Sequence, residues 1–190
     1  MTDSFEEECG VFGIYQTPEA SAHVALGLHA LQHRGQEAAG IVSKDEEAQF
    51  YAHRAAGLVG DTFNRQSVIE ALRGHAAIGH NRYSTTGEPM MRNVQPLYAE
   101  YHFGGVALSH NGNLTNAHIL SEQLKARGCL FQSTTDTEVI VHLIAISTEG
   151  GIHARLIDAL SQVKGAYSLV VLSDDGLIGV RDPYGVRPLV

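Results

Sequence analysis

A cysteine directly behind an acidic leader is the residue best suited to nucleophilic chemistry. Cys9 opens an apolar, glycine-punctuated segment, whereas residues 1–8 are polar and carry four carboxylates. A leader of that composition cannot bury itself, so we expect it to be disordered or removed. Removal would join the Cys9 thiol to an α-amino group with a pKa of about 7.7–8.0, which pairs a nucleophile with a base. Taken alone, the cysteine also fits a flexible tail ahead of a buried structural thiol.

Arg82 lies near the end of the apolar segment 75–84, which is predicted to be a buried strand. In a strand, Ile78, His80 and Arg82 share one face. An arginine at that position must meet an anion or reach water, and its rigid fork suits a carboxylate ligand. A surface arginine at a strand end is the alternative.

The pair Asn111-Gly112 follows a short apolar segment, Val106–His110. Asn-Gly is a strong hairpin signal, but a hairpin needs a return strand and the next segment is helical. A strand that ends in Asn-Gly before a helix presents a side-chain amide and a glycine N–H together. Those are the donors of an oxyanion hole.

Two further polar segments stand next to predicted buried elements. In residues 134–138, Thr135 and Glu138 have capping-box spacing, and Asp136 falls in the first helical turn, where the helix dipole favours a carboxylate. Simple capping is the alternative interpretation. Residues 31–40 form a dense polar cluster, which includes Arg34 and leads directly into a strand.

The remaining pattern predicts antiparallel sheets covered by helices, an α+β fold, because strict βαβ alternation is absent. The predicted strands are residues 9–15, 40–43, 49–54, 75–84, 106–110, 166–172 and 177–181. The predicted helices are residues 19–32, 66–73, 116–127, a segment that opens at 135–138, and 152–163.

Composition excludes several classes of protein. The chain has 190 residues, a formal net charge of -8 and a pI of about 5.7, which disfavours a nucleic-acid or anionic-membrane surface. No apolar run is long enough to span a bilayer. Two cysteines, Cys9 and Cys129, are too few for a disulfide framework, so we expect a cytoplasmic setting. The eleven histidines are scattered, and only His29 and His33 are spaced for one helix face. No acidic partner or third ligand stands near that pair, so no metal site is expected.

Taken together and in order, these motifs closely resemble the N-terminal class II glutaminase domain of the amidophosphoribosyltransferases. The matching stretches are Glu8–Ile14, Leu31–Gly40, Gly79–Gly87, His110–Leu114, Thr134–Glu138 and Arg181–Leu189. The resemblance implies an N-terminal-nucleophile hydrolase fold, a four-layer αββα sandwich. It implies a propeptide, residues 1–8, removed by self-cleavage, and a glutaminase domain over residues 9–190.

The resemblance also implies a role for each matching residue. Cys9 would be the nucleophile, with its own α-amino group as general base, and would hydrolyse glutamine to glutamate and ammonia through a thioester. Asn111 and Gly112 would form the oxyanion hole.

For substrate binding, the resemblance implies that Arg82 holds the α-carboxylate of glutamine and Asp136 its α-amino group. Thr85 would line the same pocket, and Arg34 would support the loop of the nucleophile. Thr86 stands where the glucosamine-phosphate synthase branch usually has a histidine. That difference favours the purine-synthesis branch, as does the acidic leader.

We expect the sequence to be part of a longer protein that continues into a phosphoribosyltransferase domain. In the family, ammonia passes to that domain for phosphoribosylamine formation in de novo purine synthesis. Asp174-Asp175 imitates the acidic pair of a phosphoribosyltransferase but precedes a return strand, so it is interpreted as a hairpin turn. Magnesium, and the 4Fe-4S cluster of some propeptide-bearing relatives, would belong to the missing part, and no cofactor is expected in residues 1–190. The full-length protein is expected to be a homo-oligomer.

Two alternatives remain open at this point. One is the glutaminase domain of another class II amidotransferase, such as a glucosamine-phosphate, asparagine or glutamate synthase. The other is a non-catalytic binding module that retains its leader.

Overall fold

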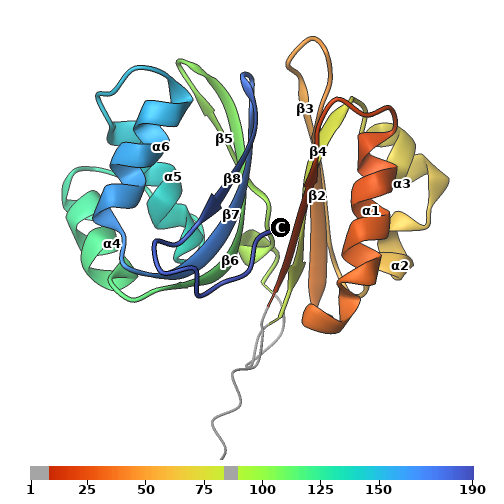
Figure 1. Cartoon of the computed structure of the whole chain (residues 1–190), viewed down its shortest axis with the longest axis horizontal. Helices are drawn as coiled ribbons and strands as arrows, with labels where there is room; N and C mark the ends of the chain where they lie inside the picture. Colours follow the sequence, from red (N-terminus) through yellow and green to blue (C-terminus); the bar gives the residue numbers. More distant parts are fainter. Residues whose placement is uncertain (1–8, 84–89) are drawn as a thin grey trace, which may run out of the picture.

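The computed structural model describes residues 9–83 and 90–190, which form four layers in the order helices, sheet, sheet, helices (Figure 1). Within these residues both sheets are four-stranded, and every strand pairing is antiparallel. The predicted sandwich of antiparallel sheets is thereby confirmed. No helix in the described part of the chain is long and apolar enough to cross a membrane.

The first sheet has the order β1-β4-β2-β3 and is covered by three helices on its outer face. Its strands are β1 (Gly10–Ile14), β2 (Ala38–Lys44), β3 (Phe50–Ala56) and β4 (Ala76–Arg82). Its helices are α1 (Ala20–Ala30), α2 (Val59–Phe63) and α3 (Gln66–Ala71), with a 3-10 turn, η1, at Gln32–Arg34.

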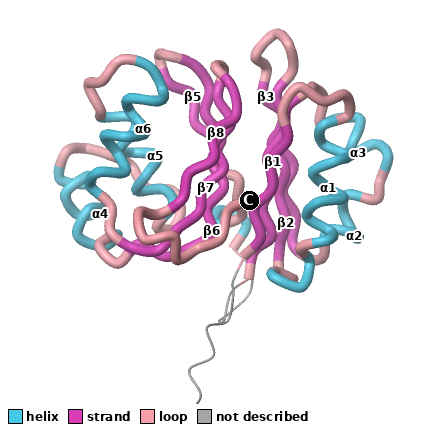
Figure 2. The backbone as a smooth tube through the Cα atoms, viewed as in Figure 1, coloured by secondary structure: helices cyan, strands magenta, loops and turns pink. Residues whose placement is uncertain are grey.

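The second sheet has the order β5-β6-β7-β8, and its helices cover the opposite outer face (Figure 2). Its strands are β5 (Leu97–Tyr101), β6 (Gly104–Leu114), β7 (Gly165–Ser173) and β8 (Gly176–Arg181). Its helices are α4 (Ala117–Ala126), α5 (Thr137–Ile146) and α6 (Gly151–Gln162), and a second 3-10 turn, η2, covers Met91–Asn93.

Strand alternation decides which side chains face the space between the sheets. Ile78 of β4 packs in the inter-sheet core with Val42 and Val170. Gly79 faces α1, where an added Cβ would lie 2.6 Å from Val24. By the two-residue period of a strand, His80 and Arg82 lie on the inter-sheet face with Ile78, as predicted.

Hydrogen bonds tie the two sheets together on either side of this core. Lys44 Nζ donates to the carbonyls of Ser173 at 2.8 Å and Asp174 at 2.7 Å, and burial lowers the pKa of the lysine. Toward the other end of β4, His80 Nε2 lies 3.1 Å from the His110 carbonyl oxygen. Burial lowers the pKa of His80 to about 3, so the ring is neutral and Nε2 carries the proton that this bond needs.

The structure corrects the sequence predictions at four places. Strand β5 and helix α2 were not predicted. Strand β6 does not end at the Asn-Gly pair but continues to Leu114, because β7 pairs with it along its whole second half. The capping box does not form among the described residues, because Glu138 bonds Gln132 N and Ser133 N, at 2.8 and 2.7 Å, and leaves the N–H of Thr135 to other partners.

Candidate active site

A polar recess of about 330 Å³ lies where one end of each sheet meets the start of α5. Both sheets contribute to its wall, together with the end of η2, the segment that follows it and the loop before α5. Its lining residues are Cys9, His80, Arg82, Tyr83, Asn93, Gln95, His110, Gly112, Asn113, Thr134, Thr135 and Asp136. The recess therefore brings a thiol, a guanidinium and a carboxylate together from distant parts of the sequence.

Cys9 precedes β1 and is held by the polar cluster after α1. Its backbone N–H donates to the Arg34 carbonyl at 3.0 Å, and Arg34 Nε donates back to the Cys9 carbonyl at 2.9 Å. The Cys9 thiol lies 3.9 Å from the Tyr83 carbonyl oxygen. Cys9 has a φ of 68°, in the left-handed region that L-residues rarely occupy, so its backbone is strained.

Arg82 is the last residue of β4 and stands at the mouth of the inter-sheet space. Its Nε lies 3.9 Å from Glu37 Oε2, too far for a hydrogen bond. Its Nη1 is buried and has no hydrogen-bond partner among the residues that the structure describes. A buried guanidinium nitrogen with an unused proton favours an anionic ligand in the recess.

Asp136 stands immediately before α5, with its carboxylate held from two sides. Oδ2 accepts from Leu114 N at 2.8 Å, and Oδ1 lies 3.5 Å from His110 Nδ1. Burial by itself would raise the pKa of this carboxyl. The hydrogen bond and charge of His110 and two backbone N–H groups outweigh burial and lower the pKa, so Asp136 is ionised at neutral pH.

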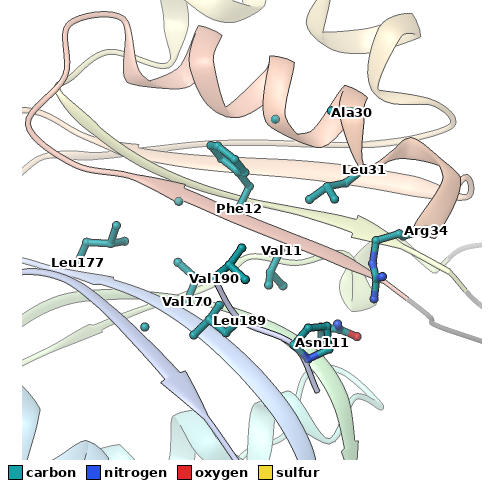
Figure 3. Close-up of a pocket in the computed structure, with 14 residues that line it drawn as sticks. Val11, Phe12, Ala30, Leu31, Arg34, Asn111, Val170, Leu177, Leu189 and Val190 are labelled. Carbon is teal, nitrogen blue, oxygen red and sulfur yellow. The ribbon is translucent and has the colours of Figure 1, made fainter. Parts of the chain in front are cut away.

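Asn111 and Gly112, the predicted oxyanion pair, open onto different spaces. Gly112 lines the polar recess and has a φ of 152°. An added Cβ would lie 2.1 Å from Ala166 O, so the position has no room for a side chain. Asn111 lines an adjoining apolar cavity of about 630 Å³ between the sheets, as does Arg34 (Figure 3). Val11, Val170 and Leu189 form part of its apolar wall.

The structure thus places Cys9, Arg82, Gly112 and Asp136 around one recess, whereas Asn111 lines the adjoining apolar cavity. Arg34 contacts the backbone of the cysteine, whereas Thr85 and the leader lie outside the described residues. The assigned roles of all these residues stay predictions.

Sequence reasoning missed Asn93 and Gln95 in the lining. No periodic pattern could have indicated them, because Asn93 ends η2 and Gln95 lies between η2 and β5, outside any strand. Among residues 9–83 and 90–190, no three histidine, cysteine or acidic side chains gather as metal ligands.

The chain is similar to known glutamine amidotransferases along almost its whole length. Residues 80–190 match the family described as a glutamine amidotransferase domain. The amidophosphoribosyltransferase of Rhizobium etli is 55% identical over 188 residues, which cover 99% of this chain and 38% of the relative. The amidophosphoribosyltransferase of Lacticaseibacillus casei is 45% identical over 97% of this chain and 94% of the relative.

A solved structure supports the same grouping. The glutamine phosphoribosylpyrophosphate amidotransferase of B. subtilis, in complex with ADP and GMP, superposes with a TM-score of 0.86 at 42% identity. The match covers 94% of this chain and 38% of that one. The chain therefore spans little more than a third of the Rhizobium and B. subtilis proteins.

Proposed function

The chain belongs to the amidophosphoribosyltransferase family as its glutamine amidotransferase domain, and on this premise we propose that its polar recess hydrolyses glutamine to glutamate and ammonia. The observation that carries the proposal is the convergence of Cys9, Arg82 and Asp136 on one recess of about 330 Å³. A thiol lies there with a cationic and an anionic side chain, the partners that an α-amino acid requires.

Arg82 and Asp136 recognise the two charges of the substrate. The guanidinium, whose buried Nη1 has no partner among residues 9–83 and 90–190, binds the α-carboxylate. The Asp136 carboxylate, kept ionised by its neighbours, binds the α-ammonium. An amide that lacks either charge leaves one of these groups unpaired and binds poorly.

Removal of residues 1–8 prepares the nucleophile. The Cys9 nitrogen becomes an α-amino group, and its bond to the Arg34 carbonyl, 3.0 Å in this structure, orients it beside the thiol. The φ of 68° at Cys9 is defined only while a residue precedes it, so cleavage also releases that backbone strain.

The reaction then follows from the order of these groups. The α-amino group takes the thiol proton, and the thiolate attacks the side-chain amide carbon of glutamine. The N–H of Gly112 and the amide of Asn111 are the proposed donors to the oxyanion. The ammonium returns the proton to the leaving nitrogen, ammonia departs, and water hydrolyses the thioester to glutamate while the thiol is restored.

The fate of the ammonia lies with the longer proteins of the family. We propose that it serves phosphoribosylamine formation on a phosphoribosyltransferase domain outside these 190 residues, in de novo purine synthesis in the cytoplasm. Magnesium, and an iron–sulfur cluster where a relative carries one, would be held by that domain, and the assembled protein would be a homo-oligomer. The 190 residues alone should consume no phosphoribosylpyrophosphate.

Steady-state kinetics of processed protein test substrate recognition. Arg82→Ala and Asp136→Asn should each raise the KM for glutamine at least about 30-fold, because unpairing a desolvated charge costs about 2 kcal/mol or more. Arg65→Ala, just before α3, and Asp175→Asn, in the β7–β8 turn, make the same charge changes at exposed positions and should leave KM unchanged. Unchanged KM in both recess variants would remove these residues from the substrate site.

A further inference from the structure

The side chain of Gln95 joins elements that the proposed reaction uses separately. Gln95 lines the recess, and only 7% of its surface is exposed. Its Oε1 accepts from His110 N at 2.7 Å, and its Nε2 donates to Thr137 Oγ1 at 3.0 Å. Its own carbonyl packs against Gly40 of β2, where an added Cβ would lie 2.2 Å from the oxygen. One residue therefore contacts β2, β6 and α5.

The two hydrogen bonds of the Gln95 side chain lead to residues next to the proposed oxyanion donors and next to the proposed amine ligand. His110 directly precedes the proposed oxyanion donors, Asn111 and Gly112. Thr137 directly follows Asp136, the proposed ligand of the α-ammonium. The side chain of His110 connects the two ends directly, since its Nδ1 lies 3.0 Å from Thr137 Oγ1 and 3.5 Å from Asp136 Oδ1.

An amide is suited to this position because it accepts and donates at once. Strand β5 pairs with β6 only as far as Leu108, so the His110 N–H lies beyond the last residue of the ladder. Gln95 Oε1 takes the place of the next strand partner. An apolar side chain would leave this buried N–H without a partner and would release Thr137.

A second amide holds the other end of the same loop. Asn93 Nδ2 donates to Thr134 Oγ1 at 2.9 Å, and Asn93 Oδ1 accepts from Thr134 N at 3.0 Å. Asn93 is 4% exposed, so this contact is also protected from water. The loop that carries Asp136 is thus bonded at both ends to side chains two residues apart in the sequence.

We propose that Gln95 is a positioning residue that fixes the distance between the oxyanion donors and the amine-binding carboxylate. The inference rests on the proposed glutamine hydrolysis. Two methylene groups limit the reach of glutamine from its α-amino group to its side-chain amide, and both ends must bind at once for attack by Cys9. Gln95 sets the matching distance in the site, because its Oε1 bonds β6 and its Nε2 bonds α5.

The test compares Gln95→Met with Thr137→Val in processed protein. Gln95→Met removes both bonds, so kcat falls and KM rises, and kcat/KM decreases roughly 10- to 100-fold, as a misplacement of about 1 Å does in other sites. Thr137→Val removes the bonds of Thr137 Oγ1 to Gln95 Nε2 and His110 Nδ1 but keeps the bond from His110 N to Gln95 Oε1. The backbone before the oxyanion donors stays anchored, so KM should rise while kcat changes little.

Lys44→Met is the matched structural control. It removes two hydrogen bonds between the sheets, one buried and one partly buried. Lys44 lies six residues along β2 from Ala38, the register partner of Arg82, which places it about 20 Å from the recess end of the strand. Lys44→Met should lower the melting temperature as Gln95→Met does, with kcat and KM within about twofold of wild type.

Several outcomes would overturn the inference. One is a Gln95→Met variant with the same kcat and KM as an active wild type. Another is a loss of activity in Lys44→Met as large as that in Gln95→Met, which would reduce the effect to general destabilisation. If Gln95→Met does not fold, an unchanged KM in Thr137→Val overturns the coupling. A wild type that hydrolyses no glutamine overturns the proposed function itself, and the inference with it.

Discussion

Mild acid should destabilise this fold through His80, the neutral histidine between the two sheets. Burial lowers the pKa of His80 to about 3, whereas an unfolded histidine titrates near 6.5. Below pH 6.5 the unfolded chain therefore binds a proton that the folded chain refuses. Stability contributed by the neutral ring is complete above pH 6.5 and decreases as the pH falls toward 3.

The size of the effect follows from these two pKa values. Each pH unit below 6.5 removes about 1.4 kcal/mol, so the free energy of unfolding should fall by about 2 kcal/mol between pH 8 and pH 5. For a chain of this length that is a decrease of about 4–8 °C in melting temperature. Carboxyls with lowered pKa values, such as those of Asp136 and Asp182, act below their unfolded values near 4, outside this window.

Urea unfolding of wild type and His80→Gln at pH 8 and pH 5 measures the contribution. The glutamine amide can still donate to the His110 carbonyl but does not titrate in this range. The difference in stability loss between the two proteins should be about 2 kcal/mol, with the other histidines common to both. An equal loss in both proteins would refute the assignment of a neutral, buried imidazole.

Three further substitutions test the site. Asn111→Ala should lower kcat roughly 10²–10³-fold with little change in KM if its amide donates to the oxyanion, and a near-normal kcat in a folded variant would exclude that role. Gly112→Ala should cost about 1–3 kcal/mol of stability by forcing β6 from Ala166 of β7, and an unchanged urea midpoint would contradict the close approach. Glu138→Gln should raise KM without abolishing hydrolysis, because Glu138 accepts from two N–H groups of the loop before Asp136; parallel melting curves separate this from lost stability.

The sheets and most helices could be predicted from the sequence because their patterns are strong and local. Alternation along β4 correctly placed Ile78, His80 and Arg82 on one face, and the turn between β7 and β8 was recognised from its composition. Strand β5 was missed because it is a short edge strand whose residues are only half-buried or exposed. Helix α2 has only five residues, the second of which is a glycine, and its first N–H, that of Val59, donates to Gln32 Oε1.

The site was less predictable where tertiary contacts replace local ones. The Asn-Gly pair predicted the end of a strand, yet pairing with β7 carries β6 through it. Asn111 therefore lines the apolar cavity from within the strand, while Gly112 lines the recess. The capping-box spacing correctly indicated the start of a helix, but Glu138 binds N–H groups of the preceding loop, at Gln132 and Ser133. The spacing gave the wrong partners because the helix begins only at Thr137.

Mass spectrometry after reaction with an electrophilic analogue of glutamine tests the central claim most directly. We predict a protein that begins at Cys9 and carries one adduct on that residue, with glutamine protecting it and Cys129 unmodified. Hydrolysis of glutamine should appear only in preparations that have lost residues 1–8, and Cys9→Ala should abolish it. An active protein that retains those residues, or activity that survives Cys9→Ala, would contradict the account.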